Sequence, residues 1–301
     1  MLPGHTLDGT APPGGWPMLP GMSLYRLEDA REIVAPALVV AFDGWVDAGL
    51  ASTTAAARLV EGAELVATFD ADALFDYRAR RPTLEILDGK PASLTWPELV
   101  LRRTRGDDGR DVLVLSGPEP DYRWRELANA AVELARRFGV VEWISLGAIP
   151  AAVPHTRPVP ILGTASRPGL LRGDVQAGPA GMLRVPSAVV SVLDLAVSAA
   201  GIPAVGYYAQ VPHYVAGPYP AAAIELLHAV GRHIGREPSL GSLREEAREL
   251  AVRLDAAALI DEATRAYVER LEAMVDEAGL PSGDELISQI ERFLREGEQR
   301  A

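Results

Sequence analysis

The chain contains no cysteine, and Lys90 is the single lysine among its 29 basic residues. The absence of cysteine excludes thiol catalysis, thiolate metal sites and disulfide bonds. The formal net charge is -12, so the chain has no basic stripe that could release counterions from nucleic acid. Nucleic acid is therefore not an expected partner.

Long uninterrupted apolar helices are also missing. The longest segment without Asp, Glu, Lys or Arg is 195–224, and four prolines interrupt it, whereas a membrane helix needs about 20 consecutive apolar residues. The first 22 residues are rich in Gly and Pro and lack the basic and apolar regions of a secretion signal. We expect a flexible leader over 1–22, no membrane contact and a cytoplasmic location.

Short apolar runs rich in Val, Ile and Leu recur along the chain. Continuous apolarity, without alternation, indicates strands that are covered on both faces. The runs are PALVVAF from Pro36, AELVATF from Ala63, DVLVLSG from Asp111, VVEWISLG from Val140, VPILGTA from Val159 and IPAVGYYAQV from Ile202.

Helical patterns lie between several of these runs, at 47–60, 122–138, 187–200 and 220–234. Alternating strands and helices predict a three-layer α/β/α domain over 23–235, with a mostly parallel or mixed sheet. TLEIL near Thr83 and ELVLRRT near Glu98 flank a polar turn, which predicts an antiparallel hairpin at the sheet edge.

The last part of the chain, 236–301, has no strand pattern and is predicted to be a helical extension. Two capping boxes, Ser242 to Glu245 and Ser282 to Glu285, mark helix starts. One apolar stripe needs a cover, and docking on the same chain is the favoured interpretation over contact with another chain. The stripe comprises Leu243, Ala247, Leu250 and Leu254, continued by Tyr267, Leu271, Met274 and Val275.

The turn from Asp43 to Asp47 follows a predicted strand end, where ligands collect in open α/β sheets. Gly44 and Gly49 have the spacing of a phosphate loop, but Leu50 and Ala51 replace its Lys and Ser or Thr. Asp47 is predicted to cap the following helix, and Asp43 to fix the turn. Metal ligation or acid/base chemistry by the two carboxylates is the alternative.

A second loop, Ser116 to Trp124, follows another predicted strand and offers Glu119, Asp121, Tyr122 and Arg123. Together with the Asp43 turn it could form a crevice. The chain has neither the G-x-S-x-G nor the H-E-x-x-H motif, so a standard serine hydrolase or zinc protease is not supported.

The five histidines have no carboxylate at a familiar metal spacing, so we expect solvated surface side chains, no metal and no cofactor. Two Gly- and Pro-rich stretches, 177–197 and 211–220, could line a pocket or form a subunit contact. The second contains His213 and Tyr214, and aromatic side chains bury much area at interfaces with little loss of rotamer freedom.

Several ordered motifs resemble the bacterial and archaeal branch of the proteasome assembly chaperone family, and in particular its actinobacterial members with a helical C-terminal extension. These motifs are AFDGWVDAGLAS, DVLVLSGPEPDYRW, LARRFGVVEWISLGAIPAAVPHTRPVPILGTAS and VPSAVVSVLDLAVSAAGIPAVGYYAQVPHYVAGPYPAA. The resemblance implies a phosphorylase/hydrolase-like α/β/α fold and homo-oligomers, most often trimers, with proteasome subunits among the expected partners.

The leading hypothesis is therefore a non-enzymatic, oligomeric protein-interaction or assembly-chaperone-like protein. Its candidate ligand or interface residues are Gly44, Trp45, Tyr122, Arg123, His213 and Tyr214. The alternative is a small-molecule hydrolase or phosphorylase at the Asp43–Asp47 and Ser116–Trp124 loops. Its candidate catalytic residues are Asp43, Asp47, Glu119 and Asp121.

Overall fold

The computed structural model describes residues 23–28, 32–34, 36–106, 109–173, 175–178 and 181–278. The predicted leader, 1–22, and the second capping box, Ser282 to Glu285, lie outside these residues. No helix of the described part is long and apolar enough to cross a membrane. The strands are β1 Tyr25–Leu27, β2 Ala37–Asp43, β3 Glu64–Phe69, β4 Thr83–Leu87, β5 Lys90–Thr95, β6 Val100–Arg105, β7 Asp111–Pro118, β8 Glu142–Ala151, β9 Ile161–Ala165, β10 Gln176–Ala177 and β11 Ala204–Pro212. The helices are the 3₁₀ turn η1 Ala48–Leu50, α1 Ala51–Leu59, α2 Ala71–Leu74, α3 Trp124–Arg137, α4 Val189–Ala199, α5 Pro220–Ile234, α6 Leu243–Ile260 and α7 Glu262–Ala278.

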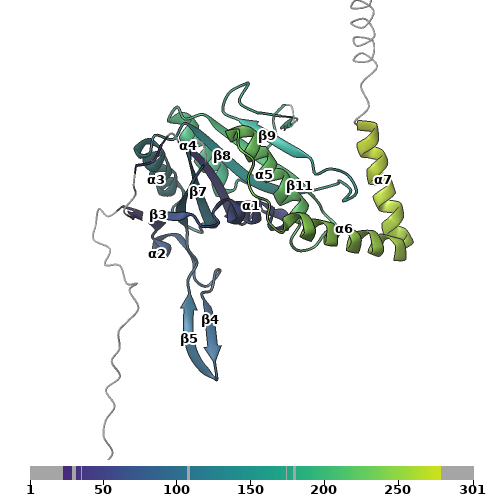
Figure 1. Ribbon diagram of the computed structural model, residues 1–301, viewed down its shortest axis with the longest axis horizontal. Coiled ribbons are helices and arrows are strands. Elements are labelled where there is room, and N and C mark those ends of the chain that lie inside the picture. The colour runs from purple at the N-terminus through teal and green to yellow at the C-terminus, as the bar shows by residue number, and fades with distance from the viewer. Residues whose placement is uncertain are drawn as a thin grey trace, which may run out of the picture.

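A mixed nine-stranded sheet forms the centre of the molecule, in the order β1-β3-β6-β7-β2-β8-β11-β9-β10 (Figure 1). The four central strands β7, β2, β8 and β11 are parallel to one another. Antiparallel strands flank them, with β6 beside β7 and β9 beside β11. The prediction of an α/β fold with a mostly parallel or mixed sheet is confirmed.

Helices cover both faces of the central strands, and strand β2 shows why its sequence is continuously apolar. Leu38 and Val40 point into the core under α3 and α4, whereas Val39 and Ala41 point into the core under α1 and α5. Successive side chains of a strand point to opposite faces, so a strand between two helical layers needs apolar residues at every position.

The predicted hairpin between TLEIL and ELVLRRT is wrong. Strand β4 instead pairs with β5 in a separate two-stranded sheet, and β6 joins the main sheet between β3 and β7. Asp88 and Gly89 explain the difference, since both have positive φ, at 49° and 74°. An Asp-Gly pair favours a tight two-residue turn, so β4 turns back at once onto the residues that follow it.

Helices α6 and α7 follow the α/β body, as the composition predicts. Leu243 is buried, and Leu250 and Leu254 pack against the core that contains α1 and α5. The apolar stripe of α6 is therefore covered by its own chain. The capping box at Ser242 is not formed: Ser242 Oγ donates to Glu246 Oε1 at 2.6 Å, and no side-chain hydrogen bond caps the helix.

Candidate functional site

The two loops singled out in the sequence lie at the same edge of the sheet. Strands β2 and β7 are parallel neighbours, with Asp43 opposite Pro118. The backbone N–H of Glu119 donates to the carbonyl oxygen of Asp43 at 2.8 Å. The carboxyl ends of these strands thus bring Asp43–Asp47 and the start of the second loop into contact.

Glu119 joins this turn to helix α4. Its Oε2 accepts a hydrogen bond from the N–H of Trp45 at 3.2 Å, and its Oε1 accepts one from the N–H of Val189, the first residue of α4, at 2.7 Å. A Cβ on Gly44 would lie 2.5 Å from Oε2, so only glycine leaves room for this carboxylate. A negative charge at the beginning of a helix is also stabilised by the helix dipole.

Asp47 is buried, and its carboxylate binds the first turn of helix α1. Its Oδ1 accepts hydrogen bonds from the backbone N–H and the Oγ of Ser52, both at 2.7 Å, and from the N–H of Thr53 at 3.3 Å. Its Oδ2 accepts from Thr53 Oγ1 at 2.6 Å. These are the first free amides of the helix, where capping side chains normally bind.

The remaining two carboxylates of the loops have other partners. Asp43 faces Arg80, with 3.6 Å between Oδ2 and Nη1. Asp121 Oδ2 accepts from the N–H of Asp76 at 2.8 Å. The hollow beside Glu119 and Trp45 is filled by its own side chains and has no room for a water-sized group. No group of three or more potential ligands among the described residues could hold a metal ion.

Two aromatic side chains of the loops remain available to a partner. Trp45 is 66% exposed and Tyr122 is 50% exposed. Arg123 precedes helix α3 with a φ of 58° and forms an ion pair with Glu126 on the first turn. Exposed aromatic side chains are frequent anchors of protein interfaces, because they bury a large area with few rotatable bonds.

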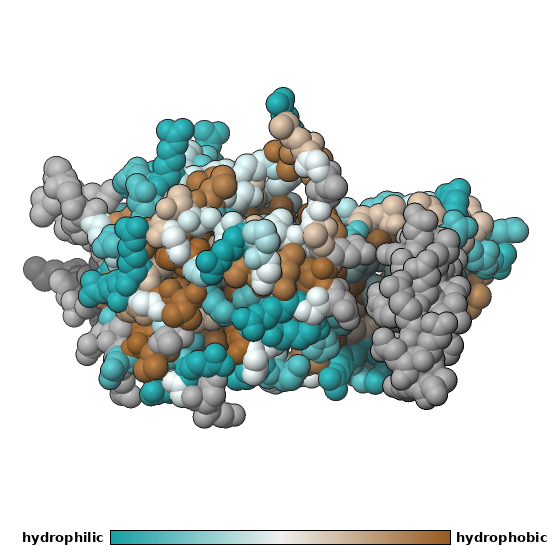
Figure 2. All heavy atoms as spheres, turned by 90° about the horizontal axis from the view of Figure 1, so that it is seen from above, coloured by the Kyte–Doolittle hydropathy of each residue, from teal (hydrophilic) through white to brown (hydrophobic). Residues whose placement is uncertain are grey.

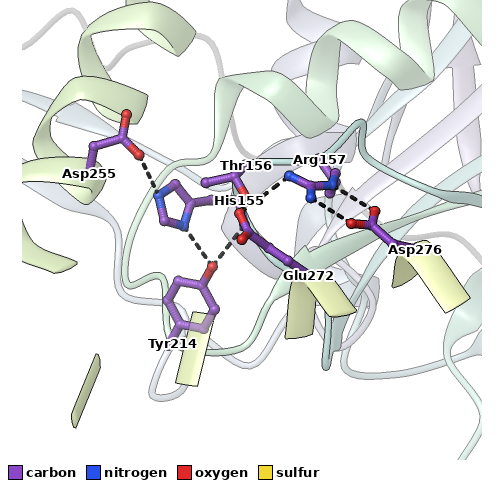
Figure 3. Close-up of polar contacts among 7 residues, drawn as sticks. All are labelled: His155, Thr156, Arg157, Tyr214, Asp255, Glu272 and Asp276. Atoms are coloured by element: carbon purple, nitrogen blue, oxygen red, sulfur yellow. Dashed lines mark hydrogen bonds and ion pairs between the residues drawn. The ribbon is translucent and has the colours of Figure 1, made fainter. Parts of the chain in front are cut away.

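His213 and Tyr214 lie beneath the C-terminal helices. His213 Nδ1 is 3.0 Å from the carbonyl oxygen of Ala151, and its Nε2 is 3.1 Å from the hydroxyl of Tyr267 on α7. Tyr214 OH is 2.7 Å from Nδ1 of His155, whose Nε2 is 3.2 Å from Asp255 on α6 (Figure 3). The aromatic turn after β11 thus contacts the chain's own helices.

Arg157, in the loop between β8 and β9 that also contains His155, adds a further contact with α7. Its guanidinium donates to both carboxylate oxygens of Asp276, at 2.8 and 2.9 Å, and to Glu272 at 3.3 Å (Figure 3). Thr156 also donates to Glu272. The paired guanidinium lowers the pKa of Asp276 below its ordinary value. These ion pairs were not predicted from the sequence, in which Glu272 and Asp276, four residues apart on one helix face, were the available signal.

The expectation that the histidines are solvated is wrong for two of them. The side chains of His155 and His233 are 3% and 4% exposed. His233 Nδ1 is 2.8 Å from the hydroxyl of Tyr207 in the core under α5, and burial lowers the pKa of His233. A histidine that exchanges one hydrogen bond with a tyrosine can be buried in its neutral form.

A partly buried carboxylate that the sequence did not reveal holds helix α4 to the sheet. Asp194 Oδ1 accepts hydrogen bonds from Trp143 Nε1, at 2.9 Å, and from Ser145 Oγ, both on strand β8. Burial raises the pKa of Asp194 to about 6, against the opposing effect of the two hydrogen bonds.

Comparisons with known proteins give a consistent result. The PAC2 family model matches residues 41–258. A Corynebacterium glutamicum protein of unknown function is 33% identical, with a TM-score of 0.79 over 85% of this chain and 98% of its own. A Mycobacterium tuberculosis protein of unknown function is 35% identical, with a TM-score of 0.79 over 87% and 93%. A proteasome-assembly chaperone homologue from M. tuberculosis is 33% identical, with a TM-score of 0.70 over 77% and 99%. No curated protein matches the chain.

Proposed function

This chain belongs to the PAC2 family, and we propose that it acts without catalysis, as an oligomeric protein-interaction partner of the assembly-chaperone type. The observation that carries the proposal is the similarity to the M. tuberculosis proteasome-assembly chaperone homologue, which is 33% identical and is covered over 99% of its length. Proteasome subunits are the partners that we propose, and a homotrimer is the assembly that we propose.

The geometry of the strand-end loops supports a role without catalysis. Each of the four candidate carboxylates already has a backbone or side-chain partner, and Asp47 alone accepts four hydrogen bonds. An acid/base pair needs carboxylates that face one space in which a substrate fits. The hollow beside Glu119 offers no such space, so the hydrolase or phosphorylase alternative has no support.

We propose that the aromatic edge, defined as Trp45 and Tyr122, is the contact surface for the partner. Both side chains are exposed on turns that hydrogen bonds hold rigidly, at Glu119 for Trp45 and at Leu74 for the backbone of Tyr122. Rigid exposed aromatics lose little entropy on binding, and their removal typically weakens an interface strongly.

The test is direct binding of purified proteasome α subunits from the same organism to the full chain and to W45A/Y122A. The expected result is binding by the full chain, weakened about 10-fold or more in the variant. The variant L259S, which changes another exposed apolar side chain on α6, is the control and should bind normally. No binding by the unaltered chain at protein concentrations of about tens of micromolar, which is roughly the weakest Kd expected of a specific contact, would contradict the proposal.

A further inference from the structure

The β4–β5 hairpin, called the arm below, projects from the body of the protein (Figure 1). Every residue of its two strands is exposed. At its base Trp96 packs edge-on against Tyr77, with 4.7 Å between the ring centroids, so the attachment of the arm is ordered. A two-stranded hairpin alone is at best marginally stable in water, and a third strand or an apolar cover is needed.

The arm has one apolar face, and its other face carries polar side chains together with Leu87, which is 68% exposed. Leu84 lies opposite Leu94 in the register, and Ile86 follows Leu84 on the same side; these three side chains are 47% to 64% exposed. On the other side Ser93 Oγ donates to Glu85 Oε2 at 2.5 Å. Such alternation is typical of a sheet with one buried face, although within the described part of the chain no element covers it.

A second uncovered apolar segment precedes helix α4. Residues 181–187 are all exposed, and the side chains of Met182, Leu183 and Val185 are 63% to 84% exposed. From 182 to 186 the backbone forms no hydrogen bond with another described residue. Figure 2 shows hydrophobic side chains gathered in the middle of one face of the molecule, between hydrophilic groups. An extended segment with unpaired N–H and C=O groups can add to the edge of a sheet.

We propose that the segment Met182–Val185 of one copy pairs with the edge of the arm of a second copy, as a third strand that extends its apolar face. The arm needs a third strand whenever the chain is folded, which a second copy supplies and a transient client does not. The charges also match, since the arm carries Glu85 and Asp88 against a single Lys90, and the segment carries Arg184. Arg184 makes no ion pair with another described residue.

The contact is head-to-tail, because the arm and the segment are different surfaces of the same chain. A repeated head-to-tail contact closes into a ring when its rotation permits. The inference rests on the self-association proposed above and identifies the surfaces that produce it. Two copies with a net charge of -12 each repel one another, so an apolar contact with local charge pairing is more favourable between them than an extensive contact between charged surfaces.

Complementation between two monomeric variants tests the proposal by light scattering after size exclusion. The arm variant is L84S/I86S/L94S, and the segment variant is M182S/L183S/V185S. Each should lose assembly, with self-affinity reduced about 100-fold or more, since three apolar side chains lose their burial. Mixed in equal amounts, the two variants should form a one-to-one dimer, because one retains the arm and the other the segment. The control V252S/L259S/I260S alters exposed apolar residues of α6 and should assemble normally.

Disulfide trapping gives a second readout that does not depend on loss of assembly, and the chain has no cysteine of its own to interfere. I86C mixed with L183C should form a covalent one-to-one dimer on oxidation, whereas E85C, on the other face of the arm, should not. A disulfide within one I86C/L183C chain, or normal assembly of the segment variant, would overturn the proposal while leaving self-association intact. A monomeric unaltered chain would refute both. If the unaltered chain assembles but does not bind proteasome subunits, only the proposed function is contradicted.

Discussion

Replacing Asp194 with Asn should change how the stability of this protein depends on pH. Burial raises the pKa of Asp194 from 3.8 to about 6, so the folded state binds this proton more tightly than the unfolded state. The stabilising effect is complete below pH 4, and it is lost as the pH rises through 6. The difference of about 2 pKa units corresponds to a loss of about 3 kcal/mol above pH 7.

Asn cannot ionise, yet its side-chain oxygen can still accept from Trp143 and Ser145. D194N should therefore match the unaltered chain near pH 4 and be more stable by up to about 3 kcal/mol at pH 7.5. The assay is urea unfolding followed by tryptophan fluorescence from pH 4 to pH 8, at low micromolar concentration because the isoelectric point is about 5.0.

The difference between the two stability curves isolates Asp194 from all other titrating groups. A second readout is the fluorescence of Trp143 in the native state, which should titrate near pH 6 in the unaltered chain and not in D194N. The control D194A removes the acceptor that Trp143 Nε1 and Ser145 Oγ share and leaves Trp143 Nε1 only its contact with Ser145 Oγ at 3.0 Å, so it should be less stable than D194N at every pH. A difference between D194N and the unaltered chain that does not vary with pH would refute the reasoning.

Three further outcomes are expected. G44A should cost about 2 kcal/mol of stability by displacing Glu119, whose Oε2 and Cβ would lie 2.5 and 2.7 Å from the new Cβ. The cost should largely disappear in the E119G background, which lacks both atoms; equal costs in the two backgrounds, measured by urea unfolding, would contradict the contact. D47A should lower stability by about 1 to 2 kcal/mol, since it removes the acceptor of the first amides of α1, whereas an unchanged urea midpoint would count against the cap. R157A should increase hydrogen exchange in α7 without affecting β2, and R265A, whose partner is Glu262, is the control. In the unaltered chain the protection of α7 should also fall in acid, because Asp276 has a lowered pKa and stays ionised, and paired with Arg157, until the pH drops through that pKa.

The sequence by itself determined the elements and the layers of this protein. Continuous apolar runs placed β2, β7, β8 and β11 between two helical layers, since each successive residue of a covered strand must be apolar. Proline and glycine in the right places also located α5, which begins at Pro220 and ends before Gly235. Such patterns are local, so each can be interpreted from neighbouring residues alone.

Only the tertiary structure decided which side chains meet. Arg157 binds Asp276 across more than a hundred positions of sequence, and Asp194 meets Trp143 only because α4 packs on β8. It also decided that β4 pairs with β5 and not with β6. The apolar runs TLEIL and ELVLRRT both look like strands, but the tight turn at Asp88-Gly89 brings β4 back onto β5 before β6 begins. The physical reason is that a partner, and with it the burial and pKa of a charged group, depends on how distant elements pack, whereas periodicity reports only which face of an element is covered.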